Sequence, residues 1–183
     1  MIRSLAGIMA GATAVAGCAG PIETRVQTHQ LVAAPQERQF TVSSTDAVQN
    51  RDLELARELV ANILREKGYR SSPDAAILVH VALSDRPADI AVVAGDENAQ
   101  QSIAAAKQKK RFQSCKDQEH RLTISLFDQG RGAKLYSGNA AEYHCNGTIA
   151  QSLPFLVGAA LSGLDDGPTD ATQSTVRTRQ GIE

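Results

Sequence analysis

Two cysteines placed symmetrically about a turn constrain this chain more than any other feature. Residues 120–143 have the pattern of a β-hairpin, because aliphatic side chains alternate with polar ones before the turn. The turn itself, residues 128–132, reads Asp-Gln-Gly-Arg-Gly, and its two glycines suit a tight reversal of the chain. Cys115 and Cys145 are equally far from Gly130. Strands paired about Gly130 would therefore place the two cysteines opposite each other.

We expect Cys115 and Cys145 to form a disulfide, because Cβ atoms of cross-strand neighbours lie about 4.5 to 5.5 Å apart. Closing a loop of about 31 residues would contribute about 3.5 kcal/mol in the loop-entropy model. A β-bulge would shift the register by one residue without forbidding the bond. A metal site built from Cys115, His120, His144 and Cys145 is the alternative, but these residues lack the paired spacing of zinc ligands.

The N-terminus has the pattern of an export signal. One cation, Arg3, precedes an apolar run over residues 5–16, which is too short to cross a bilayer. The Val-Ala-Gly-Cys sequence that ends at Cys18 resembles the lipobox of bacterial lipoproteins. That resemblance implies removal of residues 1–17, acylation of Cys18 and a stable membrane anchor. Ala19, where an aspartate would signal retention in the inner membrane, implies the periplasmic face of the outer membrane.

Composition excludes two classes of protein. Lys and Arg total 19 against 20 Asp and Glu, so no strong field would attract nucleic acid. No stretch has the roughly 18 to 20 apolar residues of a membrane-spanning helix. With 183 residues, of which 42% are hydrophobic, the chain is long enough for one domain with appendages.

The remaining periodicity predicts an α+β fold. Apolar residues three and four apart indicate amphipathic helices over residues 52–67 and 148–164. Asn50 and Gly68 are suited to cap the first of these helices. Further strands are predicted over residues 25–31, 39–43 and 76–83. We expect an antiparallel sheet with the helices packed on one face, and His80 on the other face in a structural role.

This pattern divides the chain into a lipidated tether over residues 18–24 and a single domain over residues 25–164. Within the domain, residues 85–119 form a polar insert with a predicted helix near residues 97–112. The last residues, 165–183, contain few apolar side chains, and we expect them to be disordered.

Four cations are concentrated in the insert, at Lys107, Lys109, Lys110 and Arg111. They could bind the phosphates of lipids or an anionic glycan. A solvated helix face without a ligand is the alternative interpretation.

No catalytic motif is present, since the sequence lacks Gly-x-Ser-x-Gly, His-Glu-x-x-His and a P-loop. We therefore expect no enzyme activity and no cofactor. A hydrolase whose groups converge only in the folded chain is the weakest hypothesis, and Asp85, His80 and His144 would be its residues.

The order of elements resembles a family of bacterial lipoproteins, the domain-of-unknown-function family numbered 4136. A helix ending at Lys67-Gly-Tyr69 precedes Pro73-Asp-Ala-Ala76, and the later strand ends at Asp128 before Lys134-Leu-Tyr-Ser-Gly138. The layout is shared loosely with periplasmic assembly lipoproteins of the curli-secretion and penicillin-binding-protein-activator kind. Tyr136, where the family usually has tryptophan, the basic insert and the cysteine pair depart from the pattern. The resemblance implies an α+β fold and carries over no catalytic residue.

We expect an outer-membrane lipoprotein that supports envelope assembly or maintenance by binding another envelope protein. Its partners would be the membrane, through the lipid, and that protein, with no nucleic acid or metal involved. The alternative is a module that binds peptidoglycan or lipopolysaccharide through the basic insert.

Overall fold

The computed structural model describes residues 20–33, 36–44, 50–94, 101–108 and 115–181. The predictions for the export signal and for Cys18 lie outside these ranges. The elements are β1 (Ile22–Gln30), β2 (Gln39–Val42), α1 (Arg51–Glu66), β3 (Arg70–Ser71), β4 (Ile77–Pro87), β5 (Val92–Ala94), β6 (Gln101–Ala104), β7 (Gln118–Asp128), β8 (Ala133–His144), α2 (Ile149–Ala160) and β9 (Gln173–Arg179).

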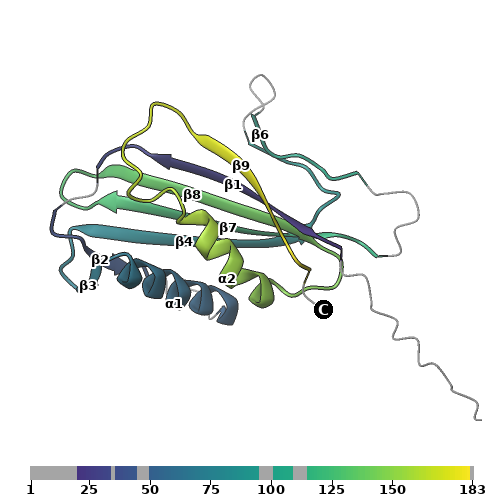
Figure 1. Ribbon diagram of the computed structural model, residues 1–183, viewed down its shortest axis with the longest axis horizontal. Coiled ribbons are helices and arrows are strands. Elements are labelled where there is room, and N and C mark those ends of the chain that lie inside the picture. Colours follow the sequence, from purple (N-terminus) through teal and green to yellow (C-terminus); the bar gives the residue numbers. More distant parts are fainter. Residues whose placement is uncertain (1–19, 34–35, 45–49, 95–100, 109–114, 182–183) are drawn as a thin grey trace, which may run out of the picture.

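Seven strands form one sheet in the order β3-β2-β4-β7-β8-β1-β9, and β5 and β6 form a separate hairpin (Figure 1). The long strands pair in antiparallel fashion, but β2 runs parallel to both β3 and β4. The predicted α+β class is thus compatible with the structure, whereas a purely antiparallel sheet is wrong. The parallel pairing arises because α1 carries the chain back along the sheet between β2 and the strands that follow.

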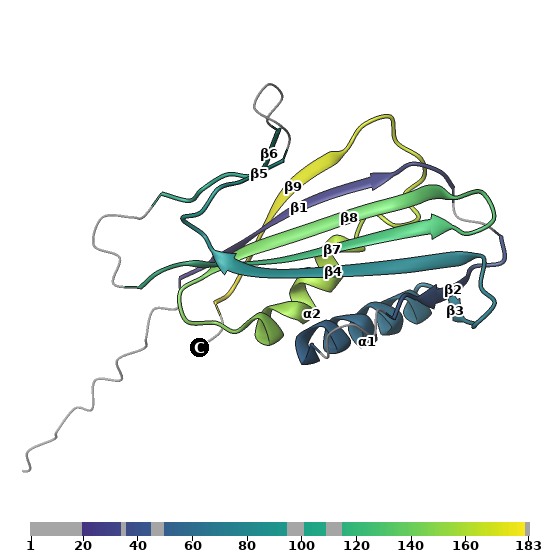
Figure 2. The same ribbon diagram turned by 180° about the vertical axis from the view of Figure 1, so that it is seen from behind.

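Both helices cover the same face of the sheet (Figures 1 and 2). The side chain of Asn50 accepts a hydrogen bond from the backbone N–H of Asp52 at 3.0 Å and caps α1. Gly68, with a φ of +86°, ends the same helix, so both predicted caps are confirmed. Thr148 and Gln151 form a reciprocal capping box at the start of α2.

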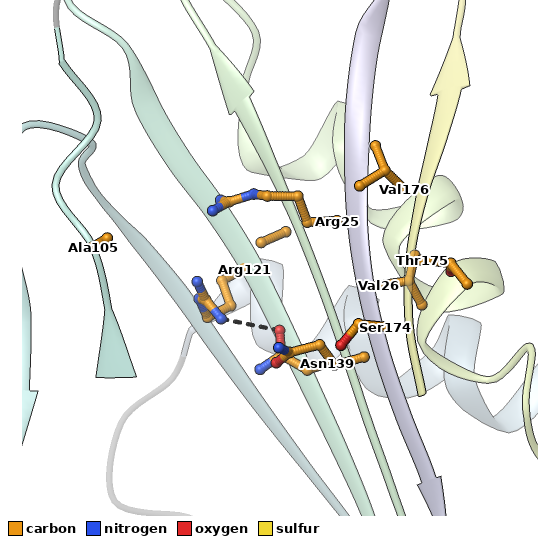
Figure 3. Close-up of a pocket in the computed structure, with 10 residues that line it drawn as sticks. Arg25, Val26, Ala105, Arg121, Asn139, Ser174, Thr175 and Val176 are labelled. Carbon is orange, nitrogen blue, oxygen red and sulfur yellow. Dashed lines mark hydrogen bonds between the residues drawn. The ribbon is translucent and has the colours of Figure 1, made fainter. Parts of the chain in front are cut away.

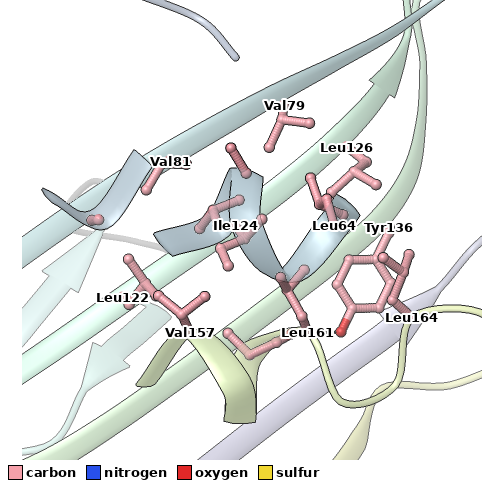
Figure 4. Packing of buried hydrophobic residues seen from close by; sticks show 14 of the residues in the cluster. Leu64, Val79, Val81, Leu122, Ile124, Leu126, Tyr136, Val157, Leu161 and Leu164 are labelled. Atoms are coloured by element: carbon pink, nitrogen blue, oxygen red, sulfur yellow. Dashed lines mark hydrogen bonds between the residues drawn. The ribbon is translucent and has the colours of Figure 1, made fainter. Parts of the chain in front are cut away.

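The hydrophobic core lies between the helices and this face of the sheet (Figure 4). Gly138 in β8 lets α2 approach the sheet, because a Cβ atom there would lie 1.9 Å from the carbonyl oxygen of Ala160. The hydroxyl of Tyr136 donates a hydrogen bond to the same oxygen at 2.5 Å. Fully buried aliphatic residues complete the core: Leu64, Val79, Val81, Leu122, Ile124, Leu126, Val157, Leu161 and Leu164.

The predicted hairpin is confirmed, with one difference in register. The carboxylate of Asp128 accepts hydrogen bonds from the turn, and Gly132 has a φ of +64°. A bulge beside Leu126 shifts the pairing, so the ladder ends at Gln118 opposite His144. Cys115 is therefore not directly across from a strand residue.

The disulfide between Cys115 and Cys145 nevertheless forms just beyond the last ladder pair. The two Cα atoms are 5.6 Å apart, which lies in the usual range for a disulfide. It fastens the end of the insert to the turn before α2.

Three boundary predictions are wrong. β1 starts at Ile22, so it includes part of the predicted tether of residues 18–24. β4 continues to Pro87 and β7 starts at Gln118, which shortens the insert, and residues 101–104 form a strand rather than part of a polar helix.

The prediction of disorder over residues 165–183 is also wrong, because Gln173–Arg179 form β9 along the edge of β1. All but the last residue of β9 are exposed. Such a strand has little apolar periodicity, and its pairing depends on the backbone of β1 rather than on a buried side-chain stripe.

Candidate functional site

The face of the sheet that carries no helix is polar. Because side chains alternate along a strand, Arg25 and Gln27 of β1 lie on this face, together with Arg121 of β7 and Asn139 of β8. Arg121 donates a hydrogen bond from Nη1 to the side-chain oxygen of Asn139 at 3.1 Å. The helix-free face therefore presents fixed hydrogen-bond donors rather than an apolar surface.

This face is hollowed between two elements (Figure 3). One is the arm, which we define as the segment from Ala88 to Asp117 between β4 and β7; the other is β9. The cavity has a volume of about 350 Å³. We call it the arginine trough, and it is lined by Arg25, Val26, Gln27, Ala105, Arg121, Asn139, Ala141, Ser174, Thr175 and Val176.

A buried carboxylate organises the arginines of the trough. Glu119 has no exposed surface, and its Oε1 atom lies 2.5 Å from Nη2 of Arg25 and 2.9 Å from Nη2 of Arg121. Arg86 of β4 forms an ion pair with the other oxygen of the same carboxylate. Burial alone would raise the pKa of Glu119, but the hydrogen bonds from Arg121 and Arg25 outweigh it and hold the pKa below its usual range.

The three arginines are not fully satisfied by Glu119. Among the described residues it is the only carboxylate paired with any of them, so three positive charges meet one negative charge. The Nε atoms of Arg25 and Arg121 are buried and have no hydrogen-bond partner in the described part of the chain. Because these two atoms are buried, an anion in the trough would contact the exposed parts of Arg25, which is 38% exposed, and Arg121, which is 19% exposed.

A second buried carboxylate lies on the opposite face, beneath α2. Glu142 of β8 accepts hydrogen bonds from the hydroxyl of Thr24 at 2.5 Å and from Nη2 of Arg179 at 2.6 Å. Nε2 of His144 lies 2.8 Å from it. Burial would raise the pKa of Glu142, but the hydrogen bonds from His144, Arg179 and Thr24 lower it to about 2.

Two histidines and a serine extend this second cluster. The Ser152 hydroxyl lies 2.8 Å from Nδ1 of His120 and 3.0 Å from Nε2 of His144, and the two rings stack with their centroids 4.6 Å apart. Asp85 lies 3.8 Å from Nε2 of His120. Burial, followed by the neighbouring His144, lowers the pKa of His120.

The hydrolase hypothesis is only partly matched by this geometry. Asp85 and His144 do converge, with His120 between them, but His80 is exposed on the other face of the sheet. Ser152 has no exposed surface, so a substrate cannot reach its hydroxyl in this conformation. Glu142 and Ser152 contact the same nitrogen of His144, whereas a catalytic triad needs its acid and its nucleophile on opposite nitrogens.

The four predicted anion-binding residues are not among those that line the trough, and Lys107 already forms an ion pair. Nζ of Lys107 is 2.5 Å from the Asp117 carboxylate and lies over the ring of Tyr143. Lys109, Lys110 and Arg111 lie outside the described residues.

Cys115 and Cys145 are joined to each other, so they do not form a ligand set with the two histidines. Within the described ranges, no group of His, Cys, Asp or Glu is placed to hold a metal ion, and no helix is long and apolar enough to cross a membrane.

Sequence reasoning missed the trough, although a signal was present. Arg25 and Arg121 occupy alternate, outward positions within predicted strands, and Glu119 lies two residues before Arg121. Charged residues at these strand positions indicate that one face of the sheet is polar. Their convergence depends on the order of the strands, which the sequence pattern does not reveal.

Comparison with known proteins identifies relatives of the fold only. No protein-family model and no curated protein matches the chain. A PelC dodecamer from Paraburkholderia phytofirmans aligns with 78% of this chain and 97% of its own, with 18% identity and a TM-score of 0.47. A PDZ domain protein from Parabacteroides distasonis aligns with 85% of this chain but only 39% of its own, with 12% identity and a TM-score of 0.53. At these identities the likeness concerns the fold alone.

Proposed function

We propose that this protein is a non-enzymatic, lipid-anchored binding protein on the periplasmic face of the outer membrane. Its arginine trough binds an acidic segment of another envelope protein and so contributes to assembly or maintenance of the envelope. The observation that carries the proposal is the surplus of guanidinium groups around Glu119 at the edge of an open cavity.

The charge of the trough favours an anionic partner. One carboxylate neutralises one of three guanidinium groups, which leaves two positive charges. Glu23 lies on the same face of β1, two residues before Arg25, and even if it is counted a positive excess remains. Arginine binds carboxylates through paired, directional hydrogen bonds, and these are stronger than bonds between neutral groups.

The wall of the trough favours a protein over a glycan. Val176 of β9 is 64% exposed and lines the cavity beside Ser174. Arginine is enriched at the centre of protein interfaces, and Val176 adds exposed apolar surface that a peptide side chain can contact. The alternative, peptidoglycan or lipopolysaccharide bound through the basic insert, loses one of its cations, because Lys107 is paired with Asp117.

The cellular location in this proposal depends on the N-terminal sequence. The lipobox-like residues that end at Cys18 support acylation there, and Ala19 supports the outer membrane. The family of lipoproteins that the element order resembles is consistent with this location.

Cross-linking in the native envelope, with mass spectrometry of a tagged, lipidated protein, tests the function. We expect reproducible capture of one envelope protein, a several-fold loss of capture in Arg121→Gln, and no change in Arg131→Gln. Arg131 is the matched control, since it is a largely exposed cation in the turn at the far end of the sheet.

A second variant separates binding from folding. Glu119→Gln removes the negative charge but keeps the shape of the side chain, so we expect capture to increase. Reduced capture in both Arg121→Gln and Glu119→Gln would show a structural role and overturn the assignment of the trough. Recovery of glycan or lipid adducts without a protein would contradict the proposal that the partner is a protein.

A further inference from the structure

The arm is largely polar in sequence, but it contains one short aliphatic hairpin. It is fastened at its base by hydrogen bonds from the N–H of Ala88 to the carbonyl of Asp117 and from the N–H of Lys107 to the carbonyl of Ala88. Beyond this base, β5 and β6 pair only with each other in the described part of the chain. The sequence of this hairpin is nevertheless largely aliphatic and alanine-rich, in particular over residues 90–94 and 103–106.

Two of these aliphatic side chains face water. Ile90 is 55% exposed and Val93 is 54% exposed. A two-stranded hairpin is only marginally stable in water by itself, and no helix covers this one (Figures 1 and 2). Burial of Ile90 and Val93 against an apolar phase would therefore stabilise the arm.

The arm leaves the sheet at the same end at which β1 begins (Figures 1 and 2). Pro87 pairs with Gln118, and Gln118 pairs with His144, so the base of the arm lies beside the end of β8. β1 is the next strand, and its first residue is Ile22. Neighbouring strands are about 4.8 Å apart, which puts Ile22 within about 15 Å of the base of the arm.

The anchor then limits how far this end can be from the bilayer. Four peptide units separate Cys18 from Ile22, and even a fully extended chain of that length spans only about 14 Å. The turn between β7 and β8 lies at the other end of the sheet, about 34 Å farther along the strand at 3.4 Å per residue. With a lipid on Cys18, the arm belongs to the membrane-proximal end.

We propose that the arm inserts Ile90 and Val93 into the headgroup boundary of the bilayer that holds the Cys18 lipid. This inference rests on the lipid anchor of the proposed function but is independent of the arginine trough. The contact depends on apolar burial of Ile90 and Val93, and the cations of the same arm, Lys107, Lys109, Lys110 and Arg111, would add attraction to anionic lipids.

Fluorescence of a labelled, lipidated full-length protein in vesicles of phosphatidylethanolamine and phosphatidylglycerol tests this contact. An environment-sensitive probe is attached at Val93→Cys, and its matched control at Arg131→Cys in the distant turn. The native cysteines do not react, since Cys115 and Cys145 are joined and Cys18 carries the lipid. We expect a blue shift and quenching by spin-labelled lipids at position 93, and neither at position 131.

Substitution of the neighbouring side chain adds a second test. Ile90→Asn should reduce quenching of the position-93 probe several-fold, whereas Val176→Asn, which changes an exposed aliphatic residue of β9, should leave it unchanged. A protein that floats with the vesicles while its position-93 probe stays in water overturns the proposal and leaves the anchor intact. Failure to float would instead contradict the anchor, and with it the location in the proposed function.

Discussion

Glu119 and Glu142 are two fully buried carboxylates near the same end of the sheet, on opposite faces. Glu142 has a fixed set of partners: a hydroxyl, an imidazole and one arginine. Glu119 instead has three arginines, and each of them has one buried nitrogen without a hydrogen-bond partner in the described part of the chain. One carboxylate is fully used in holding the fold together, whereas the other positions more positive charge than it neutralises.

The number of partners of each carboxylate distinguishes a structural site from a proposed binding site, although both sites contain the same residue types. Both clusters contain Arg and Glu, and both shift carboxylate pKa values downward. In the cluster around Glu119, Arg25 and Arg121 line an open cavity, and three arginines face one carboxylate. The two faces therefore differ in the number of arginines around the carboxylate and in their contact with a cavity. They do not differ in the presence of charged residues.

The largest expected effect is that of Glu142→Gln. It leaves Arg179 beneath α2 without its opposite charge, and loss of one partner from a buried ion pair should lower the free energy of unfolding by about 4 kcal/mol. Glu119→Gln should cost about 3 kcal/mol, because Arg86 and Arg121 are largely buried and lose their opposite charge, while Arg25 is 38% exposed. Urea unfolding followed by circular dichroism measures both, since the chain has no tryptophan. Equal losses of unfolding free energy in the two variants would contradict the proposed difference between Glu142 and Glu119.

Acid should destabilise the helix-covered face in two steps. His120 has a lowered pKa when folded, so its contribution is lost as pH falls below the ordinary value of 6.5, where the unfolded chain takes up the proton. Glu142, lowered from 4.5 to about 2, contributes about 3 kcal/mol above pH 4.5, and this is lost as pH falls toward 2. Urea midpoints measured across this range should show both steps. The lower step should shrink in Glu142→Gln, and an unchanged profile would refute its assignment.

A smaller effect should distinguish neighbouring residues of β8. Gly138→Ala places a Cβ atom against the carbonyl oxygen of Ala160, and displacement of α2 should cost about 2 kcal/mol. Ser137→Ala, on the helix-free face, should stay within about 0.5 kcal/mol of the native protein. The same urea unfolding assay compares the two variants. A tolerated Gly138→Ala would mean that α2 does not need this close approach.

Local features of the fold could be predicted from the sequence. The caps of α1 at Asn50 and Gly68 and the turn before Gly132 depend on residues close together in the chain. The parallel position of β2 could not be predicted, because backbone pairing between distant strands leaves no mark on periodicity. Strand β9 was missed for a related reason, since its side chains are exposed on both faces.

The candidate site was harder to predict than the fold. Arg25, Arg121 and Glu119 come from two strands separated by β8, and Arg86 comes from a third. Their meeting depends on strand order and on the bulge that sets the register of β7 and β8. The disulfide was predictable because its two cysteines flank a single hairpin.

The pairing of β9 with β1 has a mechanical consequence. β1 leads to the N-terminus and is hydrogen-bonded along both edges, to β8 and to β9. Since bonds between antiparallel strands lie across the strand direction, tension along β1 loads them together rather than one after another. Glu142 ties all three strands at this end, through Thr24 of β1 and Arg179 of β9. A pull through the N-terminus thus meets a strand that is hydrogen-bonded along both edges.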